Sequence, residues 1–288
     1  MLAAAVALAL ALALTSARAA RDDALEAGAA YLVARQQTDG GFAEPGGVSD
    51  PSLTAWVVLA LEAVGRDPAL VRRGGRSPAD FLAGKPNPSA TDLELRILAL
   101  AALGREAEAG ELAGRLEALR RPNGGIGPSV SSTIWGVIAL RATDRESGAG
   151  TVRFLLRAQH SSGGWSWHVT GRPDSNDTAA AIEALRAAGV PAGSKALRRA
   201  FAYLRGLRDD DGGFELDRGR GSDAQSTAWA TQAFLAAGHD SDRAAFAYLE
   251  RLRRPDGSFR YSRRYVTTPV WVTAQVLPAL AGRAFPLR

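Results

Sequence analysis

An internal repeat constrains the fold of this chain more than any other feature. Four segments superimpose without gaps: YLVARQQTDGGF (31–42), FLLRAQHSSGGW (154–165), YLRGLRDDDGGF (203–214) and YLERLRRPDGSF (248–259). A weaker copy runs from Leu116 to Ile126, a degraded copy begins at Phe81, and an alanine-rich apolar segment follows each copy. A period of about 40 to 50 residues indicates stacked supersecondary units.

Each unit combines two kinds of predicted helix. In the fifth unit, Leu197, Phe201 and Leu204 form one apolar stripe while arginines take the other side, which predicts an amphipathic first helix. The second segment of each unit is apolar nearly all round, so we expect it to be buried on most sides. The pattern predicts an all-α fold, an α/α toroid (α6/α6 barrel) of six helical hairpins that forms one domain over residues 21–288.

The turns between the paired helices fit this prediction. The residues before the first glycine of the turns are Asp39, Asn123, Ser162, Asp211 and Asp256. These side chains favour turns, and the glycine that follows can adopt a positive φ at a helix C-terminus. We therefore expect each of these glycines to end the first helix of its unit.

Residues 1–20 are predicted to be a signal peptide. An apolar run from Leu2 to Leu14 precedes a small-residue A-x-A match at Ala17 and Ala19. The run is too short to span a bilayer comfortably. We predict that the mature protein is secreted or extracytoplasmic, without stable insertion in a membrane.

The composition excludes several kinds of chemistry. The chain has no cysteine, which removes disulfides, thiolate metal sites, cysteine nucleophiles and internal thioesters. It has three histidines, and His168 has no second histidine at metal-binding spacing, so we predict no metal and no other cofactor. The net charge of +5 is spread along the chain, which argues against a nucleic-acid partner.

Two of the repeat copies carry a recognisable signature. Gln159, Gly163 and Trp165 match the QW repeat of squalene-hopene cyclases and other triterpene cyclases, and the first copy matches it with Phe in place of Trp. The chain therefore resembles the prenyltransferase and squalene-oxidase repeat superfamily over about residues 24 to 282, and is most similar to the terpenoid cyclase toroid. The resemblance implies the toroid fold.

The resemblance also points to a candidate catalytic motif. In squalene-hopene cyclases the catalytic acid is the middle Asp of D-x-D-D-T-A, at the start of an inner helix. The segment 174–179 reads DSNDTA, with Asn176 in place of that acid. Protonation of an alkene or epoxide requires a carboxylic acid held neutral by its surroundings, which Asn cannot supply. Catalysis is left open, with Asp177 or Asp174 as the candidate acid of an isoprenoid cyclase or isomerase.

The repeat offers a structural interpretation of Asp174. Asp50 and Asp223 also lie four residues before a Thr-Ala pair. A carboxylate at this place can cap the inner helix and complement its dipole. We therefore predict that Asp174 is a cap, and that Asp177, which the repeat does not explain, is the better functional candidate.

Other branches of the superfamily and similar toroids fit less well. Protein prenyltransferases and thioester domains require a cysteine and are excluded. Glycosidases of the α6/α6 class use two carboxylates across a cavity. Six carboxylates could approach one mouth of the barrel: Glu44, Asp50, Asp92, Asp174, Asp177 and Asp223. Nothing in the sequence selects a pair, so this alternative stays open.

Four tryptophans recur in the inner-helix segments. Trp56, Trp135 and Trp229 occupy equivalent positions, and Trp271 is one residue out of step. They either pack between the helix layers or line an apolar, aromatic pocket. Recurrence by repeat is compatible with both interpretations.

The predicted ligand-binding set combines these aromatic residues with polar residues of two loops. An insertion after the glycine turn of the fourth unit adds Trp167 and His168, and the loop of the last unit carries several arginines. That loop is either a solvated basic segment or a clamp for a diphosphate or carboxylate. The full set is Trp56, Trp135, Trp167, His168, Asn176, Trp229, Arg260, Arg263 and Arg264.

These observations favour a secreted, terpenoid-cyclase-like toroid with a binding role. We expect an apolar or amphipathic, isoprenoid-like small molecule, or a protein partner, to bind at the mouth formed by the N-termini of the inner helices. One alternative is the isoprenoid cyclase or isomerase. Another is a structural or adhesion module without a pocket function.

Overall fold

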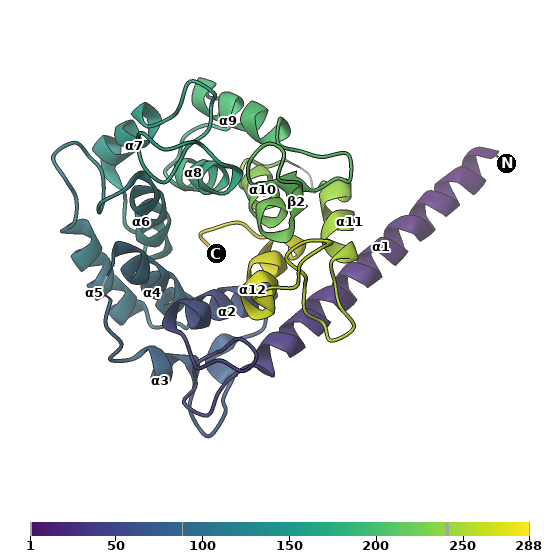
Figure 1. The fold of residues 1–288 in the computed structure, drawn as a ribbon, viewed down its shortest axis with the longest axis horizontal. Coiled ribbons are helices and arrows are strands. Elements are labelled where there is room, and N and C mark those ends of the chain that lie inside the picture. The colour runs from purple at the N-terminus through teal and green to yellow at the C-terminus, as the bar shows by residue number, and fades with distance from the viewer. Residues whose placement is uncertain (1, 88, 240–241, 288) are drawn as a thin grey trace.

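Over residues 2–87, 89–239 and 242–287, which the computed structural model describes, twelve α-helices alternate between an outer and an inner ring (Figure 1). Side chains are described from Arg18 onward. The outer helices are α1 (Leu2–Val33), α3 (Pro78–Leu82), α5 (Glu106–Glu117), α7 (Gly148–Arg157), α9 (Lys195–Arg205) and α11 (Arg243–Arg251). The inner helices are α2 (Pro51–Ala63), α4 (Ala90–Ala102), α6 (Val130–Ala142), α8 (Ser175–Ala187), α10 (Ala224–Ala236) and α12 (Pro269–Leu280). The predicted toroid of six hairpins is confirmed.

Other regular structure is sparse in the described part of the chain. A 3₁₀ turn, η1 (Pro68–Leu70), follows α2. Strands β1 (Phe214–Glu215) and β2 (Ser222–Asp223) form a short antiparallel pair in which Phe214 lies opposite Asp223. This pair joins the glycine turn of the fifth unit to the start of α10.

The core lies between the two rings. Leu197, Phe201 and Leu204 of α9 are buried, as the predicted apolar stripe requires. Each inner helix contacts the next, and α12 contacts α2, so the inner ring is closed. Closure leaves no terminal unit with an open apolar face.

Glu44 helps to close the ring between its first and last units. Thr268, which precedes α12, makes no side-chain cap. Instead the Glu44 carboxylate accepts hydrogen bonds from the backbone N–H groups of Val270 at 3.0 Å and Trp271 at 2.9 Å. A side chain of the first unit thus caps the last inner helix, which stabilises the closed ring.

A threonine near the start of the inner helix fixes each glycine turn to the helix that follows it. In five units the threonine hydroxyl oxygen accepts a hydrogen bond from a backbone N–H of the turn, with N–O distances of 2.9–3.0 Å. The acceptor and donor pairs are Thr54 and Phe42, Thr133 and Ile126, Thr178 and Trp165, Thr227 and Phe214, and Thr273 and Phe259. The second unit, which lacks the glycines, has Leu93 at this place. The threonine therefore belongs to the turn rather than to the helix alone.

The glycine turns also join neighbouring units. Gly163 has a φ of +100°, and a Cβ there would lie 2.6 Å from the carbonyl oxygen of Arg199 in α9. Gln159 donates to the carbonyl oxygens of Gly163 and Ala196, both at 2.8 Å. The QW residues thus fasten one unit to the outer helix of the next.

The predicted signal peptide, residues 1–20, lies largely outside the residues whose side chains are described, and it stays a prediction. Helix α1 extends beyond the ring at its N-terminal end (Figure 1). Within the described part of the chain, no helix has both the length and the apolar character needed to cross a bilayer.

Candidate functional site

The N-termini of the inner helices surround one mouth of the barrel, and carboxylates cap most of them. Three equivalent carboxylates each accept a hydrogen bond from the backbone N–H group three residues later. Asp50 accepts from Leu53 at 2.7 Å, Asp174 accepts from Asp177 at 2.8 Å, and Asp223 accepts from Ser226 at 2.8 Å. The predicted caps of α2, α8 and α10 are confirmed. Ser129 caps α6 in the same way.

Two further candidate carboxylates of the mouth are also structural. Asp92 forms a capping box with Ser89 at the start of α4, and Glu44 caps α12. Five of the six carboxylates that could approach the mouth therefore satisfy helix N-termini. Asp177 is the exception, because its carboxyl group caps no helix.

Asp174 and Asp177 form a carboxyl pair at the start of α8, which we call the acid pair. Asp177 is 9% exposed, and the two side chains share a hydrogen bond. Burial and the neighbouring Asp177 carboxylate raise the pKa of Asp174 to about 7, and burial also raises the pKa of Asp177. Asp174 is therefore partly protonated near neutral pH, and its protonated form can act as a general acid or a hydrogen-bond donor.

Residues from a second inner helix and from the insertion loop surround the acid pair. The buried Ser131 of α6 hydrogen-bonds to the carboxylate of Asp177, and the electrostatic interaction with His168 lowers the pKa of Asp177. The Trp167 carbonyl accepts the N–H groups of Val130 at 3.0 Å and Ser131 at 3.3 Å. The insertion loop is thus fixed above the starts of α6 and α8. Asn176 is partly exposed and accepts from the hydroxyl of Ser175.

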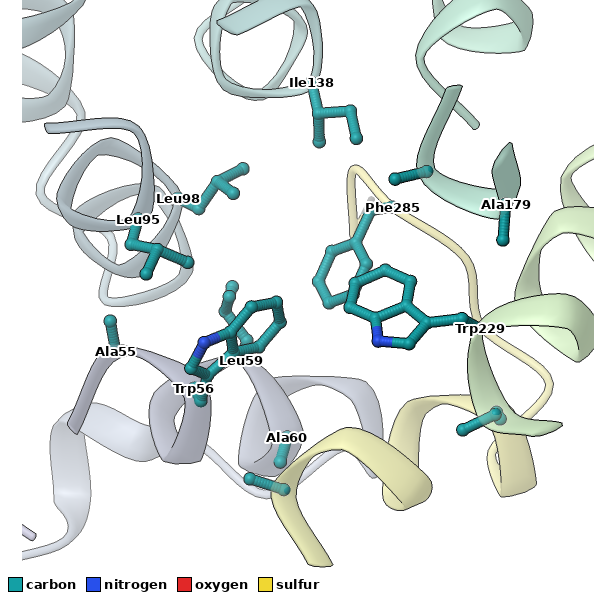
Figure 2. Close-up of a cluster of buried hydrophobic side chains, with 14 of the residues drawn as sticks. Ala55, Trp56, Leu59, Ala60, Leu95, Leu98, Ile138, Ala179, Trp229 and Phe285 are labelled. Atoms are coloured by element: carbon teal, nitrogen blue, oxygen red, sulfur yellow. The ribbon is translucent and has the colours of Figure 1, made fainter. Parts of the chain in front are cut away.

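The recurring tryptophans converge in the centre of the barrel. The ring centroid of Trp56 lies 5.5 Å from that of Trp135, 5.7 Å from Trp229 and 6.0 Å from Trp271, mostly in edge-to-face geometry. Figure 2 shows Trp56 and Trp229 pointing into the lumen. The interpretation that they pack between the helix layers is wrong. These four residues, the tryptophan layer, fill the lumen below the mouth.

A segment that the sequence analysis did not single out also enters the lumen. The ring of Phe285, which follows α12, lies 6.0 Å from Trp56, 6.2 Å from Trp135 and 5.9 Å from Trp229 (Figure 2). Its backbone N–H donates to the carboxyl group of the fully buried Glu183 at 2.6 Å. Burial raises the pKa of Glu183 to about 8.

The basic loop lies at a different part of the mouth. Arg263 and Arg264 line a pocket of about 490 Å³ whose lining also includes Asp209, Asp211 and Asp223. Arg260 is exposed and donates to the carbonyl of Arg263. Because carboxylates face the arginines, this pocket is a mixed polar surface, which is less selective for anions than a purely basic clamp.

The predicted residues therefore fall into three groups. The acid pair, Asn176, Trp167 and His168 come together at α8, the tryptophans meet in the lumen, and the arginines lie near α10 and α12. Ser131, Glu183 and Phe285 escaped the sequence analysis. An acid within an apolar helix was a signal for Glu183, whereas nothing in the repeat marked Phe285. No group of three or more His, Asp or Glu side chains that could hold a metal ion occurs in the described part of the chain.

Comparison with known proteins supports a cyclase-like fold. The family model of the squalene-hopene cyclase C-terminal domain matches residues 136–272. No curated protein sequence matches the chain. The family match spans the inner helices α8 and α10 completely.

Solved structures match nearly the whole chain. A variant of the type II terpene cyclase MstE from Scytonema, in complex with geranylgeranyl dihydroxybenzoate, is 17% identical with a TM-score of 0.70, over 93% of this chain and 98% of that chain. A protein from Actinoplanes is 21% identical with a TM-score of 0.68, over 91% and 99%. A glycosidase in complex with glucose is 14% identical with a TM-score of 0.62, over 92% and 98%. With its family match and its ring of six hairpins, the chain is a squalene-cyclase-like α/α toroid.

Proposed function

We propose that this protein binds a small amphipathic, isoprenoid-like molecule at the mouth of the barrel. The observation that carries the proposal is an exposed apolar rim directly above the acid pair. Trp167 is 51% exposed and Val169 is 58% exposed, although the backbone of their loop is held to α6. A fixed aromatic side chain left in solvent is typical of a binding surface.

Apolar side chains recur on the other loops around the mouth. Of seven large apolar residues that are exposed among the described side chains, six lie on the loops that precede inner helices; they are Val48, Leu119, Trp167, Val169, Tyr265 and Val266. An apolar chain can lie on this rim while its polar head hydrogen-bonds to Asp174 and Asp177. A terpene cyclase of the same fold binds geranylgeranyl dihydroxybenzoate, a molecule of this kind.

Farnesol, an isoprenoid alcohol, provides the test. Calorimetric titration of the full chain should show binding, and Trp167→Ala should weaken it about tenfold or more because a large apolar contact is lost. Leu70→Ala is the matched control, since Leu70 is exposed but lies outside these loops. The proposal fails if farnesol does not bind, or if the two substitutions weaken binding equally.

The acid pair favours a second candidate function, an isoprenoid cyclase or isomerase. With its pKa raised to about 7, Asp174 is partly protonated near neutral pH, and a proton donor needs that protonated form. Asn176→Asp restores D-x-D-D-T-A and should reveal or increase cyclisation of a polyprenyl substrate in product analysis. Wild-type activity that survives Asp177→Asn would contradict this site, and inactivity of both the wild type and Asn176→Asp would favour binding. The tryptophan layer fills the lumen that a cyclising chain would need, so we favour binding.

We also propose that the protein is exported. The apolar run and the A-x-A match at Ala17 and Ala19 support cleavage after Ala19 or Ala20. Mass spectrometry of the protein recovered from its own host should find a chain that starts at Ala20 or Arg21. A chain from the cytoplasm with an intact N-terminus would contradict export.

A further inference from the structure

The segment 283–287 lies inside the barrel in a way that the repeat does not require. Helix α12 ends at Leu280, and the chain then turns back so that Phe285 is only 3% exposed, between rings from three inner helices. Figure 2 shows its ring beside Trp229 in the lumen. The tryptophan layer thus closes the lumen toward the mouth, and this segment fills it from the other end.

Glu183 places a carboxyl group against this segment. It lies five residues after Thr178, a place that Leu59 and Ile138 occupy in α2 and α6, and Figure 2 shows both of those side chains pointing into the lumen. The Phe285 N–H donates to Oε2 of Glu183, whereas Oε1 has no hydrogen-bond partner among the described residues. A fully buried acid is therefore aimed into the lumen with half of its hydrogen-bonding capacity unused.

Two other polar atoms of the lumen wall are unpaired within the described part of the chain. They are Oε1 of Gln232, which occupies the same layer in α10, and Nε1 of Trp56. A buried polar atom without a partner destabilises the fold, because it has lost its hydrogen bonds to water. The lumen therefore offers more hydrogen bonds than the segment 283–287 satisfies, as expected of a site that also receives another molecule.

We propose that the lumen is a ligand site and that residues 283–287 are an internal plug that a small apolar amine displaces. The plug presents one N–H to Glu183 and one benzyl group to the tryptophan layer. An arylalkyl amine presents the same two features, and its ammonium group adds donors for the unpaired oxygens. Indole rings further stabilise a cation that lies against their faces.

This site is separate from the proposed function at the mouth, and neither depends on the other. Farnesol binding at the rim involves Trp167 and the acid pair, whereas the amine contacts Glu183 and replaces Phe285. A ligand can bind only to the molecules in which the plug is displaced. Its apparent affinity therefore equals its affinity for the open site multiplied by the fraction of molecules that are open. Weakening the plug should therefore strengthen binding.

The test uses 2-phenylethylamine and the full chain. In the wild type, saturating amine should increase hydrogen exchange in the peptide that contains Phe285. Phe285→Ala should bind the amine about tenfold more tightly or better, because no plug must be displaced. Adding Glu183→Gln to Phe285→Ala should weaken amine binding about tenfold, because Gln cannot ionise and form an ion pair with the bound ammonium group.

Two controls make the outcome decisive. Ethylbenzene has the same apolar body without a donor, so its binding to Phe285→Ala should not depend on Glu183. Phe259→Ala, which removes an equally buried ring outside the lumen, should not gain affinity for the amine. Unchanged exchange of the wild-type segment in saturating amine would overturn the proposal even if Phe285→Ala fails to fold. Equal affinities of Phe285→Ala for the amine and ethylbenzene would also overturn it.

Discussion

Helices α8 and α10 are neighbours in the inner ring with the same cap but different interiors. Asp174 and Asp223 each cap their helix in the same way. Three residues after the cap, α8 has Asp177 where α10 has Ser226, whose hydroxyl donates to Asp223 at 2.9 Å. Six residues further along, α8 has Glu183 where α10 has Gln232. One helix carries carboxyl groups at the two places where the other carries neutral hydrogen-bonding groups.

Some polar residues of α8 recur in other hairpins and stabilise the ring, whereas others do not recur. A cap recurs because it satisfies the N-terminus of an inner helix, and the threonine recurs in the five units that have a glycine turn. Asp177 and Glu183 are not features of the repeat, because α10 has Ser226 and Gln232 at their places. Buried carboxyl groups are costly to ionise, and such groups are enriched at functional sites. The two buried carboxyl groups of α8 are therefore the features to test against α10.

The largest expected effect is the pH dependence that Glu183 adds. The pKa of Glu183 is about 8 in the folded protein and in the ordinary range of a glutamate in the unfolded chain. At pH values between these two pKa values, the folded state binds one proton more than the unfolded state. The resulting stabilisation is complete at low pH and is lost as the pH rises through about 8. From about pH 5 to pH 9, the free energy of unfolding of the wild type should fall by about 4 kcal/mol more than that of Glu183→Gln.

Urea denaturation across this pH range measures the difference. Gln232→Glu is the reciprocal variant, and it should add a similar fall in α10. Parallel curves for the wild type and Glu183→Gln would show that Glu183 ionises in the folded protein as easily as in the unfolded chain, and would contradict the contrast between the helices.

The shared caps should respond alike. Alanine at Asp50, Asp174 or Asp223 should lower the free energy of unfolding by about 0.5–2 kcal/mol, while Asn should restore most of it because it caps equally well. A thermal-shift series tests this. If Asp174 alone proves sensitive, the start of α8 has a structural role beyond the repeat.

Asp177→Ser gives α8 the residue found in α10 and should have the smallest effect on stability. It removes a buried carboxylate next to Asp174 but keeps a hydroxyl that can hydrogen-bond to the cap, as Ser226 does in α10. We expect a change in the free energy of unfolding below about 1 kcal/mol near neutral pH. A loss of more than about 2 kcal/mol in chemical denaturation would make Asp177 a structural residue.

Much of the fold could be predicted from the sequence because local rules repeat in it. The glycine turns, the amphipathic outer helices and the caps at Asp50, Asp174 and Asp223 follow from patterns a few residues long. The sequence also indicated Asp177 as the exception among the carboxylates of the mouth. The structure shows it to be the one member of that set that does not cap a helix.

The remaining features depend on contacts between distant residues. Glu44 caps a helix 226 residues away, which becomes evident only when the ring closes. The tryptophans recur in the inner helices. Whether they meet the outer layer or the lumen depends on how the inner helices are rotated in the ring, which local sequence patterns do not determine. Phe285 follows the last repeat, so no periodicity predicted where it would lie.

Carboxyl-carbon NMR with labelled aspartate, recorded against pH with and without farnesol, tests the central claim that the acid pair of α8 lies in the binding site. Asp174 should titrate near pH 7, move to a lower pKa in Asp177→Ser, and shift in the presence of farnesol. Asp223 should not respond to farnesol, because its helix lacks the second carboxylate. If Asp174 titrates in the ordinary range of an exposed aspartate and farnesol leaves both residues unchanged, the mouth of α8 is not the site.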